Sequence, residues 1–461
     1  MAAPTLAHNS QAHNLRAILS ERGFRRLLGV RVISQVADGW FQSGLAGSVL
    51  FNPQKQASAI AIATGFAVLL LPYSLIGPYV GVFLDRWSRR SIIYTTNLLR
   101  AALVLPAVGM IWVGNEGVLF PVLAFLIIGL NRFFLAGLGA SIPHVVEDQR
   151  LVTANAVAGT LGSICYSLGL ASSVVLLRVV GVPATFHGYA ALSALAPLGY
   201  LASALLARFS FECDALGPDA VERRRDTVVA GLVEVGRGMV AGIRHLAGKR
   251  GAAYAMLAQA GFRVLYGVLA LATLLLYRRY FNTGHDFSGS IAGLGMVFLG
   301  GSLGVLLGAF LTPPVTRRAG GWRWITWLLG GTGVVVFALG LPFRSMSLVV
   351  ATLLINVAAQ GIKIVVDTDL QHECDDEYRG RVFSVNDTTY NLAFVGGLFL
   401  AAEALPADGH SPTMLVLVSI GFLLLTAWYA RVGGRWARRV GDDIAGPVHA
   451  AKAHPAASPS R

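Results

Sequence analysis

Five charged side chains lie within long apolar stretches of this chain. Asp38, Arg132 and Arg263 lie at or near the middle of three such stretches, and a fourth contains both Lys363 and Asp367. Placing a charged side chain at the centre of a hydrocarbon layer costs at least about 2.5 kcal/mol, so a charge found there usually has a function. A carboxylate can bind and release a proton, whereas the guanidinium of arginine keeps its charge and binds anions or holds carboxylates. These five residues are the first candidates for a functional site.

Lys363 and Asp367 are four residues apart, a spacing that places both side chains on one face of a helix. We therefore expect them to form an ion pair. Two interpretations of the pair are open. It could belong to a binding site, or it could be a structural lock in which two buried charges only offset each other.

Asp38 also has two interpretations, a proton or substrate site and a permanently ionised partner of Arg132. A proton carrier must bind and release its proton within the working pH range, which calls for a carboxyl in a special environment. Gln35 and Gln42 are seven residues apart and lie near the same helical face as Asp38. Both amides could therefore add hydrogen bonds at this place.

The composition of the whole chain indicates a protein embedded in a membrane. The 461 residues are 55% hydrophobic and only 13% charged, with a mean hydropathy of +0.62, whereas an average soluble domain is about 25% charged. The 53 glycines agree with helices that pack closely in lipid. The net charge of +13 does not indicate nucleic-acid binding, because the basic residues lie between hydrophobic runs rather than on one polar face.

The apolar runs predict an all-α membrane protein with twelve spanning helices. Each run is long enough to cross a bilayer, which takes about 20 apolar residues, and none shows the alternation of a β-barrel strand. Arg31 and Arg100 lie nearer the ends of their runs, where we expect the side chains to extend to the membrane surface. The predicted spans are 27–51, 59–83, 91–113, 118–142, 153–177, 186–207, 254–277, 288–312, 324–343, 346–370, 385–405 and 413–430.

The basic residues are distributed unequally between the two sides of these helices. With the N-terminus inside, the inside loops and tails contain 27 of the 37 Lys and Arg residues, and the outside loops contain five. Loops on the cytoplasmic side of membrane proteins carry the excess of positive charge. Both termini are therefore predicted to be cytoplasmic.

The longest predicted loop separates six helices from six. Its segment 228–250 is apolar on one side and basic on the other, as in a helix that lies on a membrane surface, although a solvated linker is the alternative. From Gly441 the tail is rich in Ala, Pro and Ser, which predicts disorder. The predicted parts are a cytoplasmic N-terminal segment 1–23, a six-helix bundle 24–207, the cytoplasmic central loop 208–253, a second six-helix bundle 254–432 and a cytoplasmic tail 433–461.

A short internal repeat supports two related halves. GVFLD at residues 81–85 ends the second predicted helix, and GAFLT at residues 308–312 ends the eighth, with a pair of arginines following each. The two copies are offset by 227 residues and fall at the same place in their halves. The eighth helix also has small residues at every fourth position, which permit close approach of a neighbouring helix: Gly300, Gly304 and Gly308.

The stretch GVFLDRWSRR, residues 81–90, has the spacing of the signature G-x-L-x-D-R-x-G-R-R. Five of its residues match: Gly81, Asp85, Arg86, Arg89 and Arg90. Phe83 and Ser88 replace the usual Leu and Gly. With its two sets of six helices, long central loop and inside termini, the sequence resembles the major facilitator superfamily over residues 24–432. The resemblance implies that helices 1, 4, 7 and 10 line a central cavity, and that Asp85 and its Arg neighbours form a cytoplasmic gate.

Two further stretches resemble the bacterial drug and macrolide-efflux branch of that superfamily. They are VEDQRLVTANAV after the fourth predicted helix and DEYRGRVFSVND before the eleventh. The fifth helix, GTLGSICYSLGLASS, lacks the Gly-Pro pair usual in proton-coupled drug antiporters. Arg132 is followed by Gly137 rather than by a glycine four residues on. These departures concern the transported molecule and leave the superfamily resemblance intact.

The resulting prediction is a secondary transporter that works by alternating access, with proton-coupled efflux of a hydrophobic or amphipathic small molecule. Asp38 is the predicted proton carrier, and Arg132, Arg263, Lys363 and Asp367 are predicted cavity charges. The chain contains no GxxxxGK[ST] loop, so an ion gradient or the substrate's own gradient is expected to drive it. Three alternatives stay open: an importer or facilitator of an anionic metabolite, a lipid or lysolipid flippase, and a non-transporting membrane sensor.

The expected partners are the lipid bilayer, a small-molecule substrate and protons or another coupling ion, without nucleic acid, and the chain is expected to be a monomer. No enzyme activity, cofactor or metal is expected. The three cysteines are scattered, and His372, Glu373 and Cys374 indicate only a polar helix end. Arg outnumbers Lys by 33 to 4 and Ala and Gly are abundant, as in GC-rich bacterial genomes. The predicted location is the plasma (inner) membrane of a bacterium.

Overall fold

The computed structural model of this chain is helical, with no β-strand in the part that it describes. The chain divides into two compact units, residues 1–236 and 237–461. The division falls within α10 (Val228–Gly248), inside the predicted central loop. The described residues are 17–50, 58–114, 117, 119–147, 150–179, 185–218, 227–281 and 287–451.

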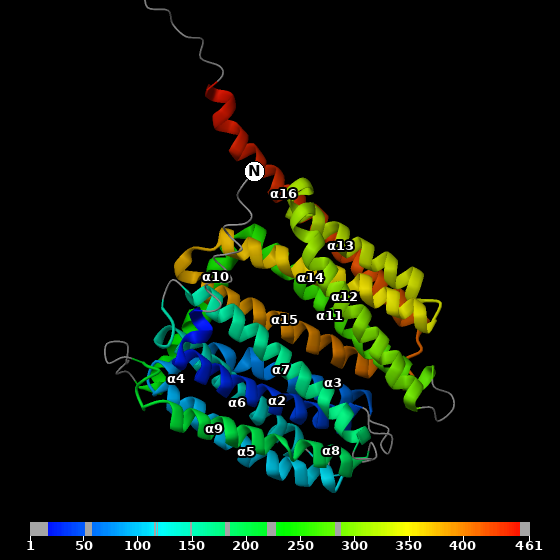
Figure 1. Ribbon diagram of the computed structural model, residues 1–461. Helices are drawn as coiled ribbons and strands as arrows, with labels where there is room; N and C mark the ends of the chain where they lie inside the picture. The colour runs from blue at the N-terminus through cyan, green and yellow to red at the C-terminus, as the bar shows by residue number, and fades with distance from the viewer. Residues whose placement is uncertain are drawn as a thin grey trace, which may run out of the picture. The chain divides into compact units, whose positions relative to one another are not determined.

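The first unit contains the helices of the first six predicted spans (Figure 1). Its second span joins α3, a 3-10 turn and α4, and its sixth joins α8 and α9. Pro78 and Pro197 lie at these two junctions, where a residue without an amide hydrogen interrupts the helical hydrogen bonds. The helices are α2 (Arg22–Leu50), α3 (Ala59–Leu75), α4 (Val80–Leu84), α5 (Arg89–Trp112), α6 (Leu119–Ser141), α7 (Leu151–Val179), α8 (Phe186–Ser193) and α9 (Ala196–Ser210).

The second unit contains the helices of the last six predicted spans. The first and third of them each end in a π-helical turn, at Leu276–Tyr280 and Val336–Gly340. The helices are α11 (Arg250–Leu275), α12 (Phe287–Ala319), α13 (Gly321–Val335), α14 (Ser345–Glu373), α15 (Asp376–Ala404) and α16 (Pro412–Ala451).

Ten helical segments in the described residues are long and apolar enough to cross a membrane. The two other predicted spans, α2 and α15, are helices of 29 residues each. Both contain several charged residues, which lower their mean hydropathy below that of an ordinary spanning helix. All twelve predicted spans therefore coincide with helices, and the all-α prediction is confirmed.

Glycines bring helices into close contact at equivalent places in the two units. In the first unit, α2 meets α7 where a Cβ on Gly39 would lie 2.6 Å from the Cα of Gly169. In the second unit, α11 meets α15 where a Cβ on Gly267 would lie 3.0 Å from the Cα of Gly397. Both pairs are offset by 228 residues (267 − 39 and 397 − 169), one more than the offset of GVFLD and GAFLT. The two halves are therefore built on one pattern of helix packing.

The predicted glycine stripe on α12 packs against α14. A Cβ on Gly304 would collide with the carbonyl oxygen of Leu353, and one on Gly308 would lie 2.7 Å from the carbonyl oxygen of Val357. Only a residue without a side chain allows two helix backbones to approach so closely. The predicted close approach is confirmed.

The ends and the central loop of the chain differ in how far the structure tests them. α16 continues to Ala451, so the disorder predicted from Gly441 is corrected for residues 441–451, because extending an existing helix adds one hydrogen bond per residue. Residues 1–16 and 452–461, within the predicted N-terminal segment and tail, lie outside the described residues. The apolar and basic segment of the central loop forms α10, as its pattern predicts.

Replacing Gly304 by Ala should weaken the packing of α12 on α14, because the added methyl group overlaps the Leu353 carbonyl oxygen. Overpacking of this kind costs about 1–3 kcal/mol, so the melting temperature of the purified protein in detergent should fall. Gly295→Ala on the same helix is the matched control, since a Cβ there meets no atom within 4 Å. An equal fall in both variants would contradict the close packing at Gly304.

Candidate functional site

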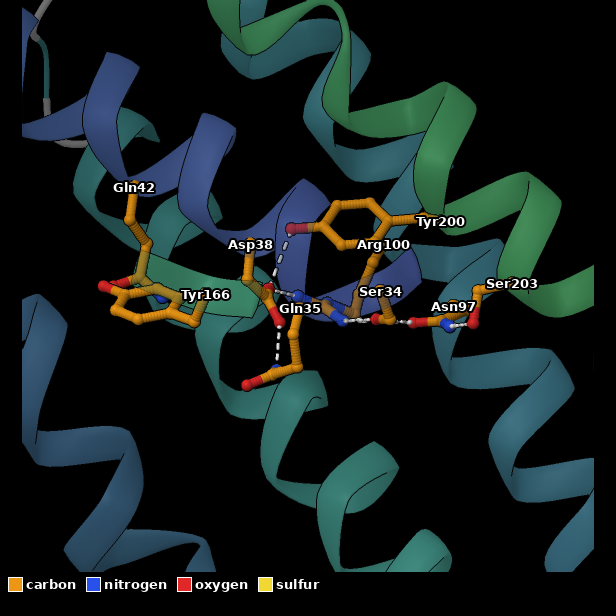
Figure 2. A network of polar contacts seen from close by, with 9 residues as sticks. All are labelled: Ser34, Gln35, Asp38, Gln42, Asn97, Arg100, Tyr166, Tyr200 and Ser203. Carbon is orange, nitrogen blue, oxygen red and sulfur yellow. Dashed lines mark hydrogen bonds and ion pairs between the residues drawn. The ribbon is translucent and has the colours of Figure 1, made fainter. Parts of the chain in front are cut away.

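Asp38 lies in the interior of the first unit and is contacted by residues of three helices (Figure 2). Its Oδ1 forms an ion pair with the guanidinium of Arg100, on α5, and accepts a hydrogen bond of 2.9 Å from the hydroxyl of Tyr200, on α9. Its Oδ2 accepts a hydrogen bond of 2.7 Å from the amide of Gln35, one turn earlier on α2. A single carboxylate thus connects α2, α5 and α9.

The network extends beyond the ion pair through neutral side chains (Figure 2). A second nitrogen of Arg100 donates to Oδ1 of Asn97 at 3.0 Å and to the hydroxyl of Ser34 at 3.2 Å. The amide of Asn97 donates to Ser203 at 3.0 Å, and the Ser203 hydroxyl donates to the carbonyl of Val30 at 2.7 Å. The chain of bonds therefore ends on the backbone of α2, the helix on which it begins.

The ion pair is closed off from solvent. Asp38 and Arg100 each expose 1% of their surface, and Tyr200 exposes none. The Arg100 guanidinium carbon lies 3.9 Å from the centroid of the Tyr200 ring, so the cation also has an aromatic face against it. Removing one partner of such a buried pair costs about 3–5 kcal/mol, because the other charge is left uncompensated.

Arg100 does not extend to a membrane surface, which corrects the expectation from its position. It lies eleven residues after Arg89, the first residue of α5, or roughly 16 Å along the helix axis. The carboxylate of Asp38 holds the side chain in the interior instead. Asn97, one turn before Arg100, marks a polar helix face at this depth, and that signal could have identified the partner from the sequence.

The arginine expected to pair with Asp38 is elsewhere. Arg132 lies half-buried on α6, and the ion pair of Asp38 is with Arg100. The second glutamine predicted near Asp38 is also outside the network, because the side-chain oxygen of Gln42 accepts a hydrogen bond of 2.8 Å from Tyr166 on α7 (Figure 2). Of the residues predicted around Asp38, only Gln35 contacts it.

The second unit contains the ion pair predicted from the sequence. Lys363 Nζ lies 2.8 Å from Asp367 Oδ2, one turn further along α14. Asn386, on α15, donates to the other carboxylate oxygen at 3.4 Å. The side chains of Lys363 and Asp367 are 33% and 28% exposed, so this pair is more accessible than the buried pair of the first unit.

Arg263 lies among aromatic rings in the second unit. Its guanidinium carbon is 3.9 Å from the centroid of the Tyr390 ring, 4.3 Å from that of Phe394 and 5.3 Å from that of Tyr266. Lys363 Nζ lies 5.5 Å from the Tyr390 ring, so this ring connects Arg263 to the ion pair on α14. The sequence identified the charges but not the rings, because tyrosine and phenylalanine are common in spanning helices.

A family model described as Major Facilitator Superfamily matches residues 32–398, most of the chain. The chain belongs to the major facilitator superfamily. Two relatives, both described as uncharacterised MFS-type transporters, come from Mycobacterium bovis and Mycobacterium tuberculosis. Each is 35% identical over 425 residues, which cover 91% of this chain and 93% of the relative.

More distant similarities agree with this assignment. Macrolide efflux protein A of Streptococcus pyogenes is 28% identical over 133 residues, or 28% of this chain and 33% of that protein. The solved structure of the nucleoside transporter NupG has a TM-score of 0.59 and 13% identity, covering 90% of this chain and 98% of NupG. A POT family transporter has a TM-score of 0.59 and 12% identity, with 88% and 96% covered. Such structures share the fold alone.

The superfamily assignment makes the chain a multi-pass membrane protein and a membrane transporter. Proteins of the major facilitator superfamily are generally not enzymes. The expected fold is confirmed together with the family, and a transporter implies a small-molecule substrate and a lipid bilayer around the helices.

In this superfamily member, the arginines of the GVFLDRWSRR stretch bind the ends of neighbouring helices. Arg89 donates to the carbonyl of Ala140 at 3.0 Å, and Arg90 donates to the carbonyl of Arg208 at 2.8 Å, near the C-terminal ends of α6 and α9. Arg86 donates to a carbonyl of the preceding turn at 2.7 Å. The last carbonyls of a helix lack backbone donors and carry partial negative charge, so Arg89 and Arg90 act as caps.

The other residues of the stretch have different surroundings. The carboxylate of Asp85, directly after α4, is exposed and has no side-chain partner within the described ranges. A Cβ on Gly81 would meet no atom within 4 Å, so crowding does not explain this glycine. Ser88 is the N-cap of α5, with φ −52°, a conformation that needs no glycine.

Ser88 also contacts an exposed thiol beyond α9. Its hydroxyl donates to the carbonyl of Cys213, whose sulfur lies 3.8 Å from the same oxygen. Hydrogen bonding with the hydroxyls of Ser88 and Ser91 lowers the pKa of the Cys213 thiol. Cys165 and Cys374 are buried, so Cys213 is the exposed cysteine among the three.

Proposed function

We propose that this chain is a proton-coupled secondary transporter that exports a hydrophobic or amphipathic small molecule. The observation that carries the proposal is the ion pair of Asp38 and Arg100, buried where α2, α5 and α9 meet. No P-loop is present in the sequence, so the driving force is an ion gradient rather than ATP bound by this chain.

The pair offers a way to couple a proton to a change of helix packing. The ionised carboxylate of Asp38 compensates Arg100 and accepts hydrogen bonds from Tyr200 and Gln35. A proton on Asp38 removes the negative charge and leaves a buried guanidinium uncompensated, which is unfavourable by several kcal/mol. The protonated state therefore favours any arrangement of α2, α5 and α9 in which Arg100 is better solvated or has another partner.

The direction and the cargo are proposed from similarity and composition. Part of the chain is similar to macrolide efflux protein A of Streptococcus pyogenes, and two stretches of the sequence resemble that branch. Export of an amphipathic molecule agrees with a substrate that enters from the bilayer. A second candidate, passage of an anionic metabolite, is favoured by the surroundings of Arg263.

The GVFLDRWSRR stretch is proposed to act as a gate on the cytoplasmic side. Its arginines could anchor the loop by lipid electrostatics alone, but lipid attraction does not account for an exposed acidic residue among them. Asp85 is exposed and has no side-chain partner in the described part of the chain, so it is available for a contact that forms in one state of the cycle. Thr312 stands at the equivalent place of the second half, and the latch is therefore one-sided.

The protein is proposed to lie in the plasma (inner) membrane of a bacterium as a monomer, with both termini in the cytoplasm. The charge asymmetry of the loops supports this orientation. The residues 208–253, including Cys213, are then cytoplasmic.

Asp38→Asn should abolish macrolide accumulation driven by a pH gradient in proteoliposomes, because the amide cannot carry a proton. The variant should still fold, since an amide keeps the shape of the carboxylate and its hydrogen bonds to Tyr200 and Gln35. Full gradient-driven accumulation in this variant would remove Asp38 as the proton carrier.

The double variant Asp38→Asn, Arg100→Gln separates a proton carrier from a structural lock. Removing both charges eliminates the uncompensated guanidinium, so folding should recover to near the wild-type melting temperature. A proton carrier remains absent, and the double variant should be stable but without proton-driven transport. Recovery of transport would mean that the pair serves only to hold the helices.

Asp85→Asn should shift the balance between inward-open and outward-open states, because the proposed latch loses its charge. The balance can be measured as distances between spin labels on the two units. Glu212→Gln, an exposed acidic residue just beyond α9, is the control and should leave the distances unchanged. Unchanged distances in both variants would contradict the gate.

A membrane-impermeant maleimide should label Cys213 in inverted membrane vesicles and not in intact cells. The thiolate is the reactive form, and hydrogen bonding with Ser88 and Ser91 lowers the pKa of this thiol. The labelling rate should therefore reach half its maximum at a pH below that of an ordinary thiol, and Ser88→Ala should raise that pH. A variant with Cys165 and Cys374 replaced by Ala isolates the signal. Labelling in intact cells would reverse the proposed orientation.

A further inference from the structure

Arg263 is a buried cation without an acidic partner. Its side chain is on α11 and exposes 8% of its surface. Its Nε donates to the carbonyl of Tyr390 at 3.4 Å, and among the described residues its other two nitrogens have neither a hydrogen bond nor an ion pair. A guanidinium has five N–H donors, so most of its hydrogen-bonding capacity is unused.

The contrast with the first unit makes this vacancy of charge significant. Arg100 is as deeply buried, but it is compensated by Asp38 and hydrogen-bonded by Asn97 and Ser34. By the 228-residue offset of the two halves, Arg263 stands where the first unit has Gln35 (263 − 35). An uncompensated buried charge is destabilising, and the aromatic faces around Arg263 offset only part of that cost.

A second unpartnered polar group lies one turn away. Gln259 is on the same face of α11 as Arg263 and exposes 2% of its surface. Neither the oxygen nor the nitrogen of its amide has a hydrogen-bond partner in the part of the chain that the structure describes. Buried amides are almost always hydrogen-bonded in folded proteins, so an unpaired one calls for a missing partner.

The net charge around the rings is positive. Tyr390 lies against Arg263 on one side and within 5.5 Å of Lys363 on the other. The charge of Lys363 is balanced by Asp367, 2.8 Å away, and that of Arg263 is not. One negative charge would make this cluster neutral.

The rings around Arg263 determine what kind of anion fits. Phe394 is buried, whereas Tyr266 and Tyr390 are half-buried, and all three place their rings within 5.3 Å of the guanidinium carbon. Aromatic walls favour a flat apolar body, and a guanidinium with two free nitrogens matches the two oxygens of a carboxylate. We infer that Arg263, with Gln259, binds the acidic group of an aromatic or otherwise apolar monoanion, and that molecules of this class are the substrates of the transporter. The inference rests on the proposed transport function and adds the chemical class of the cargo.

The test uses the purified full-length protein in detergent and two probes, 2-naphthoate and its uncharged methyl ester. The melting temperature should rise with 2-naphthoate and rise much less with the ester. A charge-assisted hydrogen bond corresponds to about a tenfold change in affinity or more, so naphthoate should bind at least about tenfold more tightly. Equal effects of the two probes on the wild-type protein would overturn the inference.

Arg263→Gln should abolish the preference for naphthoate over its ester, while Arg323→Gln should keep it. Arg323 is the matched control, since it is an exposed arginine of the same unit that lies 5.6 Å from the ring centroid of Trp322. If Arg263→Gln does not fold, Arg263→Lys keeps the charge without the planar pair of donors and should weaken naphthoate about tenfold without affecting the ester. A preference that survives in Arg263→Gln, or an unweakened one in Arg263→Lys, would contradict the site.

Asp38→Asn separates this inference from the proposed proton coupling. That variant should lose proton-driven transport and still prefer naphthoate, because Asp38 and Arg263 lie in different units. Loss of the preference in Asp38→Asn alone would place anion binding at Asp38 and refute the role of Arg263. Loss of the preference in Arg263→Gln with normal proton drive in Asp38→Asn would leave the anion site standing and remove the proton carrier.

Discussion

A charge buried in an apolar interior must be compensated, and this constraint accounts for the polar chemistry of both units. In the first unit the compensation is complete, because Asp38 and Arg100 neutralise each other and neutral hydrogen-bonding groups surround them. In the second unit, Lys363 and Asp367 neutralise each other, whereas Arg263 has only aromatic faces against it. The first arrangement can respond to a proton, and the second is suited to an anion, so one physical requirement leads to two different chemistries.

The scaffold that carries these groups is repeated, but the groups are not. Gly39 and Gly169 pack α2 on α7 as Gly267 and Gly397 pack α11 on α15, with a constant offset of 228 residues. Close backbone contacts of this kind depend on the absence of a side chain and constrain both halves equally. Side chains that face other helices are free to differ, and the two halves have diverged at these positions. A transporter built in this way can bind its coupling ion in one half and its cargo in the other.

The arginines of the GVFLDRWSRR stretch show how one motif can have a structural and a functional part. Arg89 and Arg90 cap the C-terminal ends of α6 and α9, which connects the loop to helices that are distant in sequence. Such contacts stabilise the first unit in any state of a transport cycle. Asp85 makes no comparable contact among the described residues, and it is therefore the residue of the stretch that is available to change partners.

Several features of this protein followed from the order of residues alone: the membrane class, the positions of twelve helices, the superfamily, the glycine contact of α12 and the pairing of Lys363 with Asp367. Each of these depends on composition or on residues within one helix, where spacing determines which side chains meet. The partner of Asp38 could not be obtained in this way, because Arg100 and Tyr200 lie 62 and 162 residues away. The aromatic surroundings of Arg263 likewise come from both α11 and α15. Which faces of two helices meet depends on their neighbours and their rotation about the helix axis, and only the packed tertiary structure specifies these.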